Sequence, residues 1–196
     1  MFTATTDKRV AVFLAEGMEE IEALTVVDLL YRAGIPCETV SITNSNVATS
    51  SHDVSIVCDR EIGDTRFDFD DYDMIVLPGG MPGTTNLGEC EDLTDQVRRF
   101  AADGRQVAAI CAAPTILAKL GITDGKKATC YPGLETQMGE ANMQPGAAAV
   151  QDGRLLTGAG PGTAIDFGLL LVRALRGEEA AKKVYDGLVY RLARPE

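Results

Sequence analysis

The chain has 196 residues, a length that suits one domain with a sizeable hydrophobic core. Hydrophobic residues make up 45% of it and charged residues 24%, a balance typical of soluble globular proteins. Its 18 basic and 29 acidic side chains give a formal net charge of −11, so its surface repels phosphate backbones and no nucleic-acid partner is expected. The apolar runs are far shorter than the roughly 20 residues that span a bilayer, which excludes a membrane span. We expect a single domain over residues 1–196.

The cysteine and histidine contents restrict the chemistry further. The five cysteines form an odd set without a C-x-x-C pair, which argues against a disulfide framework and against a structural zinc site. His52 is the single histidine, so a Cys-His dyad or a histidine-based metal site has one candidate. The polar start of the chain lacks the apolar segment of a secretory signal, and we expect a cytoplasmic protein.

Continuous apolar runs predict strands buried on both faces, and apolar residues at helical spacing predict helices. Ile21, Leu24, Val27 and Leu30 form such a helical row, which Gly34 ends. The elements expected up to residue 103 are a strand at 9–15, a helix from 18 to 33, strands at 37–41, 55–58 (paired with an extended segment at 50–54) and 74–77, and a helix at 92–103.

Turn signals organise the second half of the chain. Asp152-Gly153-Arg154 separates two short apolar runs and predicts a β-hairpin. Thr163 is a good N-cap for a long apolar helix. The elements expected here are a strand at 106–110, a helix at 112–120, a strand at 127–130, a short helix at 134–142, hairpin strands at 148–151 and 155–157, and helices at 163–175 and 178–192.

Strands that alternate with helices predict an α/β fold, in which a mostly parallel sheet has helices on both faces. Such sheets bind ligands beyond the carboxyl ends of their strands. Three loops of this chain lie at such ends, at residues 16–22, 78–83 and 111–114. Their convergence predicts the functional site.

Cys111 lies between the strand at 106–110 and the helix at 112–120. At such a junction the free N–H groups of the helix N-terminus point toward the side chain, which favours a thiolate and lowers the thiol pKa below about 8.5. Hydrolases hold their serine nucleophile at the same kind of turn, although the glycines of that motif are absent here. Cys111 is therefore either a nucleophile or a small buried hydrophobe.

The other two loops carry groups that such a nucleophile needs. The glycines of residues 77–83 either turn backbone N–H groups toward an oxyanion or form a plain turn. Glu19, Glu20 and Glu22 open the first helix, where carboxylates complement the helix dipole. Glu22 lies deepest, and burial near a thiolate would keep it protonated, as a hydrogen-bond donor or proton shuttle. Residues 158–163 lack the final glycine of a dinucleotide motif, so a plain glycine turn is expected there.

Four segments together resemble the ThiJ/PfpI superfamily, in the branch of the Parkinsonism-associated protein deglycase and bacterial YajL. They occur in the family's order and spacing, and the similarity covers nearly the full length of the chain. The matching segments are Ala15-Glu-Gly-Met-Glu-Glu-Ile-Glu22, Val76-Leu-Pro-Gly-Gly80, Ala109-Ile-Cys-Ala-Ala-Pro114 and Gly160-Pro-Gly-Thr163.

The resemblance implies a flavodoxin-like α/β sandwich that forms a homodimer and needs neither a metal nor an organic cofactor. It makes Cys111 the reactive, oxidisable nucleophile and Glu22 the carboxylic acid hydrogen-bonded to its sulfur. Glu19 would line the pocket. The implied backbone donors to an oxyanion are Gly79, Gly80 and Ala112.

Three positions narrow the reaction class. Tyr131 stands where some family members have a histidine near the nucleophile, and tyrosine donates a hydrogen bond but is a poor base at neutral pH. This disfavours Cys-His acyl transfer. Ala112 stands where the protease-like branch has a histidine, which disfavours proteolysis. His52 aligns with a family arginine near the pocket rim. We expect His52 to be a surface residue, and a contact with the ligand is the second alternative.

The leading hypothesis is a cysteine-dependent deglycase (hydrolase) or glyoxalase (lyase) that acts on methylglyoxal or early glycation adducts and protects against oxidative stress. The alternative is a redox-responsive chaperone or sensor, which would bind client proteins and use oxidation of Cys111 without substrate turnover. A glutaminase-like amidotransferase is a third and weaker hypothesis, because the chain lacks the catalytic histidine.

Overall fold

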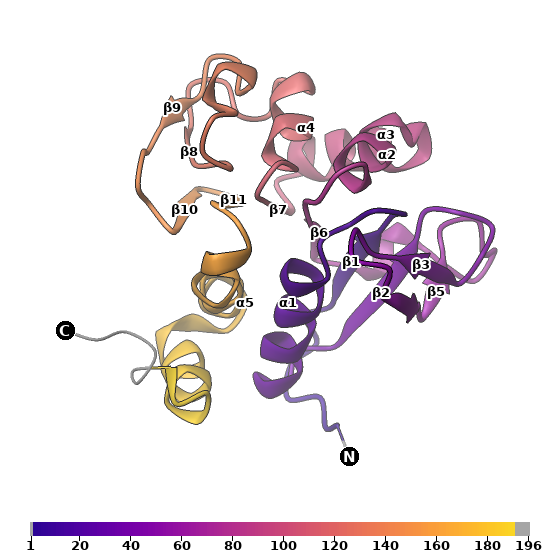
Figure 1. Cartoon of the computed structure of the whole chain (residues 1–196). Coiled ribbons are helices and arrows are strands. Elements are labelled where there is room, and N and C mark those ends of the chain that lie inside the picture. Colours follow the sequence, from indigo (N-terminus) through magenta and orange to yellow (C-terminus); the bar gives the residue numbers. More distant parts are fainter. Residues whose placement is uncertain (1, 191–196) are drawn as a thin grey trace.

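A computed structural model describes residues 2–190 and contains a seven-stranded sheet with helices on both faces (Figure 1). The strand order is β10-β11-β7-β6-β1-β2-β5, and all neighbours run parallel except the β10–β11 hairpin. The predicted flavodoxin-like α/β sandwich is confirmed. Its strands are β1 (Val10–Leu14), β2 (Cys37–Ser41), β5 (Arg60–Glu61), β6 (Met74–Leu77), β7 (Gln106–Ile110), β10 (Ala149–Asp152) and β11 (Leu155–Gly158).

The two faces of the sheet carry separate helix layers. Helices α1 (Glu20–Arg32) and α5 (Ala164–Gly187) cover one face, and α2 (Gly83–Glu89), α3 (Glu91–Ala102) and α4 (Pro114–Lys119) cover the other. Alternate residues of each central strand point to opposite layers: Val10, Val12 and Leu14 of β1 join the α1–α5 core, whereas Ala11 and Phe13 join the other core. Both faces are therefore apolar, which explains the continuous hydrophobic runs.

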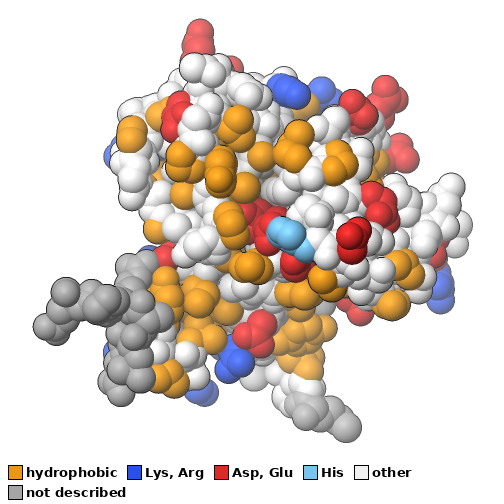
Figure 2. Space-filling model, in the orientation of Figure 1, with side chains coloured by type: hydrophobic (Ala, Val, Ile, Leu, Met, Phe, Trp, Pro, Cys, Tyr) orange, Lys and Arg blue, Asp and Glu red, His pale blue; other side chains and the backbone are white. Residues whose placement is uncertain are grey.

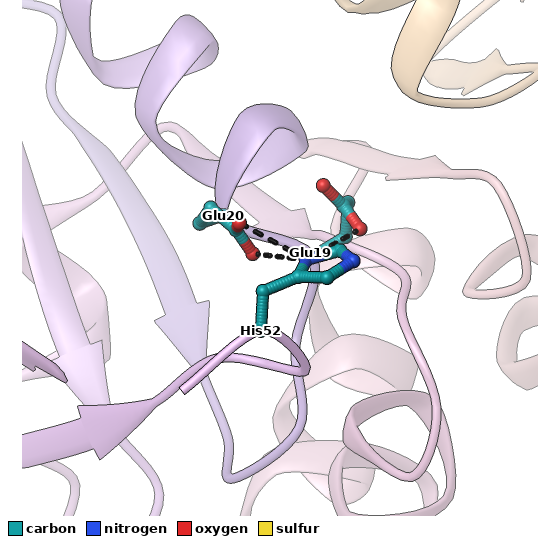
Figure 3. Close-up of side chains that lie close together, drawn as sticks. All are labelled: Glu19, Glu20 and His52. Carbon is teal, nitrogen blue, oxygen red and sulfur yellow. Dashed lines mark hydrogen bonds and ion pairs between the residues drawn. The ribbon is translucent and has the colours of Figure 1, made fainter. Parts of the chain in front are cut away.

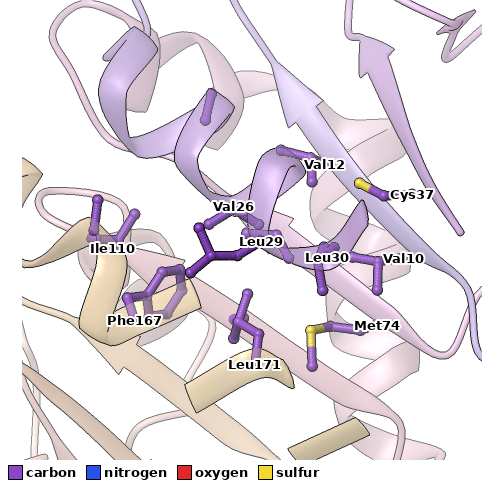
Figure 4. Close-up of a cluster of buried hydrophobic side chains, with 14 of the residues drawn as sticks. Val10, Val12, Val26, Leu29, Leu30, Cys37, Met74, Ile110, Phe167 and Leu171 are labelled. Carbon is purple, nitrogen blue, oxygen red and sulfur yellow. The ribbon is translucent and has the colours of Figure 1, made fainter. Parts of the chain in front are cut away.

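Helix α1 buries a face that matches the predicted apolar row only in part. Leu30 is fully buried, as the row predicted, but Ile21 is 52% exposed and Leu24 is 40% exposed, whereas Leu29, which lies outside the row, is 1% exposed and packs in the core with α5 (Figure 4). A Cβ atom on Gly168 of α5 would lie only 2.8 Å from Leu29 Cδ2. The absence of a side chain at Gly168 allows this close approach of the two helices, and it selects the face on which Leu29 lies.

The segment between β2 and β6 also differs from its prediction. Strand β4 (Ser55–Val57) pairs with β3 (Val47–Thr49), not with residues 50–54. Residues 50–54 form the turn between these two strands, in which Asp53 N–H donates to Ser50 C=O and Asp53 has a φ of +62°. The two-stranded ribbon lies apart from the main sheet and places this turn beside the start of α1, where Ser51 N–H donates to Met18 C=O at 2.8 Å.

The helix predicted at 134–142 is wrong, because only a 3₁₀ turn (Glu135–Gln137) forms there. Gly133 and Gly139 have φ of +95° and +60°, a left-handed conformation that does not continue a helix. Strand β9 (Asn142–Met143) follows and pairs with β8 (Lys127–Ala128), which is shorter than the strand predicted at 127–130.

The remaining predictions hold with shifted boundaries. The β10–β11 hairpin is confirmed, and α4 begins two residues later than expected. The predicted break between the two C-terminal helices is confirmed, because Gly177 interrupts α5 with a non-helical φ of 81° and ψ of 176°. The predicted end at residue 192 lies outside the described residues. The predicted N-cap is wrong: Thr163 Oγ1 donates to Gly160 C=O and accepts from Gly160 N–H, and it makes no side-chain cap on α5. Helix α2 was not predicted from the sequence. Within residues 2–190, every helix is too short or too polar to cross a lipid bilayer.

The strand order places the candidate loops together. The chain leaves β1 for β2 on one side and later returns to β6 on the other side of β1, so the order reverses between β1 and β6. Such a reversal opens a crevice at the carboxyl ends of the strands. The loops after β1 and β6 meet there, since Glu19 N–H donates to Gly79 C=O at 2.9 Å.

Substitutions on opposite faces of α1 test its packing. Leu29→Ala is expected to lower the free energy of unfolding by about 2–5 kcal/mol, because it leaves a cavity beneath the helix. Leu24→Ala on the exposed face is expected to change it by about 0.5 kcal/mol or less. Urea denaturation measures both values, and equal losses would contradict the assigned buried face.

Candidate active site

Cys111 occupies a tight turn between β7 and α4. Its φ of +66° lies in the left-handed region, which residues other than glycine rarely adopt. The turn is held from two sides, because Cys111 N–H donates to Gly158 C=O at 2.9 Å and Cys111 C=O accepts from Tyr131 N–H at 2.7 Å. The residue is buried, with 9% of its surface exposed. This geometry fits the strand–nucleophile–helix turn that the sequence predicted.

Glu22 lies against this thiol although it belongs to α1. Its side chain is fully buried, and its Oε2 accepts a hydrogen bond from Gly79 N–H at 2.8 Å. Its Oε1 is buried and, among the described residues, accepts no hydrogen bond of good geometry. Burial raises the pKa of Glu22 to about 7, and the hydrogen bonds with Cys111 and Gly79 oppose that rise. The carboxyl group therefore titrates near neutral pH.

The thiol pKa differs from the lowering predicted from sequence. Burial, together with the negative charge of Glu22, raises the pKa of Cys111 to about 12. The N–H groups of Gly80 and Ala112 act in the expected direction and lower the pKa, but they are outweighed. A buried thiol and a buried carboxyl group in contact resist carrying two negative charges, so near neutral pH the thiol keeps its proton while the carboxyl group passes between its neutral and its ionised form.

Two glycines after β6 complete the contact. A Cβ atom on Gly79 would lie 2.7 Å from Cys111 Cβ and 2.8 Å from Glu22 Oε2, so any larger residue would separate the thiol from the carboxyl group. Gly80 has a φ of +88°, and a Cβ atom there would lie 2.4 Å from Glu19 N. In this structure Gly79 N–H is bonded to Glu22, whereas the N–H groups of Gly80 and Ala112 face the sulfur.

Glu19 and Tyr131 lie at the border of the site. Glu19 is the N-cap residue of α1; its Oε1 accepts from Ile21 N–H at 3.4 Å, and its charge contributes to the raised pKa of Glu22. Tyr131 is 48% exposed and is fixed through its backbone to Cys111. A Cβ atom on Gly160 would lie 3.3 Å from the Tyr131 ring, so the glycine turn predicted at 158–163 borders this side chain.

Sequence reasoning did not foresee the contact between Glu20 and His52 (Figure 3). His52 Nδ1 lies 3.0 Å from one Glu20 carboxylate oxygen and 3.1 Å from the other. The hydrogen bond and charge of Glu20 raise the pKa of His52, and the imidazole lowers the pKa of Glu20. Figure 2 shows the histidine in pale blue beside red carboxylates in a hollow of the surface. The signal was absent from the sequence because only the β3–β4 turn brings residues 32 positions apart together.

A cavity of about 240 Å³ adjoins the site between α2 and α4. Its lining includes Met81 and Ala112, which directly follow Gly80 and Cys111, and also Thr84 and Lys119. Thr84 Oγ1 is buried without a hydrogen-bond partner among the described residues. The cavity therefore combines apolar walls with one anion, Glu89, and one cation, Lys119, beside the nucleophile turn.

The raised pKa of Glu22 has a measurable effect on stability. Between the pKa of the unfolded state, about 4.5, and the folded value of about 7, the folded chain binds more protons, so stability falls as pH rises through this window. Relative to Glu22→Gln, the wild-type chain is expected to lose about 2.5 kcal/mol between pH 5 and pH 8. Urea denaturation of both proteins at both pH values measures this difference. All other titratable groups are the same in the two proteins, so their contributions cancel in the comparison. A constant difference between the two proteins would contradict a raised pKa.

Known proteins share this arrangement of sequence and fold. The DJ-1/PfpI family matches residues 8–174 of the chain. Protein dj-1beta of Drosophila melanogaster is 37% identical over 183 residues, which cover 93% of this chain and 97% of that protein. The glutathione-independent glyoxalase DJR-1.2 of Caenorhabditis elegans is 31% identical over 166 residues, which cover 84% of this chain and 86% of that protein.

Solved structures agree with the sequence matches. The crystal structure of Drosophila melanogaster DJ-1beta superposes with a TM-score of 0.88 and 37% identity, over 94% of this chain and 98% of that chain. Oxidised Toxoplasma gondii DJ-1 superposes with a TM-score of 0.87 and 33% identity, over 93% and 98% of the two chains. The resemblance seen in the sequence motifs is confirmed, and the chain belongs to the DJ-1/PfpI family.

Proposed function

We propose that this protein is a cysteine-dependent enzyme of the glyoxalase or deglycase type, acting on methylglyoxal or on early glycation adducts. The contact between the Cys111 thiol and the buried Glu22 carboxyl group carries this proposal, because aldehyde conversion at a thiol needs a proton acceptor beside the sulfur. The name of the Caenorhabditis elegans relative, a glutathione-independent glyoxalase, supports the same chemistry.

The reaction begins with addition of the thiol to the aldehyde carbon. In the form with Glu22 ionised, the carboxylate takes the proton of Cys111 as the carbon–sulfur bond forms, so a free thiolate need not accumulate in spite of the raised thiol pKa. The aldehyde oxygen becomes an oxyanion, to which the N–H groups of Gly80 and Ala112 donate. Proton return from Glu22 to this oxygen gives a hemithioacetal and restores the carboxylate.

The second stage moves a hydrogen between adjacent carbons. Glu22 removes the proton from the sulfur-bearing carbon and passes it to the ketone oxygen, which gives an enediol. It then takes the proton of the hydroxyl group on the sulfur-bearing carbon and delivers a proton to the neighbouring carbon, which leaves a thioester on Cys111. Water then hydrolyses the thioester, releases lactate and restores the thiol. The net reaction is methylglyoxal plus water to lactate, without any redox partner. A pKa of about 7 suits Glu22 to both transfers at neutral pH.

The cavity beside Ala112 bears on the choice between the two substrate classes. Methylglyoxal needs little space beyond the sulfur, whereas a glycation adduct carries an amine or amino-acid portion. A volume of about 240 Å³, lined by Glu89 and Lys119, supplies room and polar contacts for such a portion. Deglycation would use the same addition at Cys111 and release the amine.

Substitution of the pair tests the proposal. Cys111→Ala is expected to reduce lactate formation from methylglyoxal to background, because no thioester forms. Glu22→Gln keeps a hydrogen-bonding group beside sulfur but cannot accept a proton, and a loss of about 10²–10⁴ in kcat is expected. D- and L-lactate detection measures turnover, and Cys58→Ala serves as a control at another buried cysteine. Full activity of Cys111→Ala would rule out this mechanism.

A redox-sensing function is the second candidate, favoured by the environment of the sulfur. Two equivalents of peroxide would convert Cys111 to a sulfinate with release of water, and Glu22 in its protonated form would donate to a sulfinate oxygen. The oxidised state of the Toxoplasma gondii neighbour supports this candidate. Peroxide-dependent client binding with lactate formation at background would favour sensing over catalysis. The homodimer, the client proteins and the cytoplasmic location remain predictions.

A further inference from the structure

A second group of polar side chains lies beside the thiol site, on Glu19, Glu20 and His52 (Figure 3). Each residue offers one ligand atom, and the three atoms lie within 4.8 Å of one another. Within residues 2–190 this is the one cluster of histidine, cysteine and carboxylate side chains close enough to hold a metal ion. The proposed aldehyde reaction uses neither Glu20 nor His52.

The loop backbone holds the imidazole in place. Ser51 N–H donates to Met18 C=O at 2.8 Å, and Ser50 and Met18 form an isolated β-bridge. Ser50 Oγ accepts from His52 N–H at 3.3 Å and from Val54 N–H at 3.2 Å. The hydrogen bonds of the loop therefore hold His52 over the start of α1 independently of the contact between the imidazole and the carboxylates.

The distances fit a metal ion without a large rearrangement. His52 Nδ1 lies 3.0 Å from Glu20 Oε1 and 3.8 Å from Glu19 Oε2. Zinc bonds of about 2.0–2.1 Å to nitrogen and oxygen give a tetrahedron with edges of about 3.3 Å. The two observed distances lie on either side of this edge length, and the three ligand atoms all lie within 4.8 Å of one another, so rotation of the two glutamate side chains would bring them to three corners.

Two carboxylates lie beside one ring nitrogen in this cluster. A proton on His52 Nδ1 serves a hydrogen bond to Glu20, and Glu19 Oε2, at 3.8 Å, lies beyond hydrogen-bond distance of the ring. The helix N-terminus favours both carboxylates, because it is the positive end of the dipole. A divalent ion satisfies all three side chains at once.

We propose that Glu19, Glu20 and His52 form a Zn²⁺ site, with water in the fourth position. The donor set decides the metal: Mg²⁺ and Ca²⁺ prefer oxygen ligands alone, whereas an imidazole nitrogen with carboxylate oxygens suits Zn²⁺. Three protein ligands with an open position are also a common zinc arrangement. The site depends on these three side chains and not on the proposed reaction at Cys111.

Calorimetric titration of the reduced, metal-free protein with Zn²⁺ tests the site. One ion per chain is expected, and His52→Asn and Glu20→Gln are each expected to weaken binding at least tenfold. Cys111→Ser and the surface control Glu178→Gln are expected to stay within twofold of the wild type. Because His52 is largely exposed, its substitution should leave the fold intact, which circular dichroism checks. Co²⁺ should bind without a sulfur-to-metal charge-transfer band.

Three outcomes would overturn the proposal. Binding that survives His52→Asn but is lost in Cys111→Ser would place the metal on the thiol. Equal binding of Mg²⁺ and Zn²⁺, unchanged by His52→Asn, would reduce the cluster to an acidic surface. Absence of Zn²⁺ binding would remove the site altogether. None of these readouts requires turnover, so an inactive protein would still decide the question.

Discussion

The contact between two acids, the Glu22 carboxyl group and the Cys111 thiol, is the constraint on which the rest of the site depends. Both groups are buried against each other, and burial raises both pKa values. One negative charge can be accommodated there, stabilised by N–H groups from Gly79, Gly80 and Ala112, whereas a second is strongly disfavoured. This arrangement keeps a proton beside the sulfur near neutral pH, which serves either proton transfer to a substrate or stabilisation of an oxidised sulfur.

The fold supplies this contact by bringing three distant segments to one edge of the sheet. Glu22 comes from the helix after β1, the glycines come from the loop after β6, and Cys111 comes from the turn after β7. The strand order reverses between β1 and β6, so the loops after these two strands lead to helices on opposite faces of the sheet. A crevice lies between the two loops. Close packing then demands glycine at position 79, where a single methyl group would push the carboxyl group from the thiol.

Much of this could be predicted from the sequence, because apolar runs and glycine turns report local structure directly. The strands β2, β6 and β7 were predicted at their observed bounds, and the motif around Cys111 marked the nucleophile turn. Tertiary contacts decided the rest: the buried face of α1 depends on Gly168 in another helix, and the Glu20–His52 pair depends on a turn between two small strands. The thiol pKa was misjudged because burial, which no local pattern reveals, outweighs the N–H groups.

The most direct test of the shared charge is an infrared pH titration that compares the wild type with Glu22→Gln. The difference spectrum isolates the C=O stretch of the protonated Glu22 carboxyl group. If burial holds the proton there, the band is present at pH 6 and disappears with a midpoint near 7. A band that is already absent at pH 6 would show an ordinary, ionised glutamate and would contradict the account of this site.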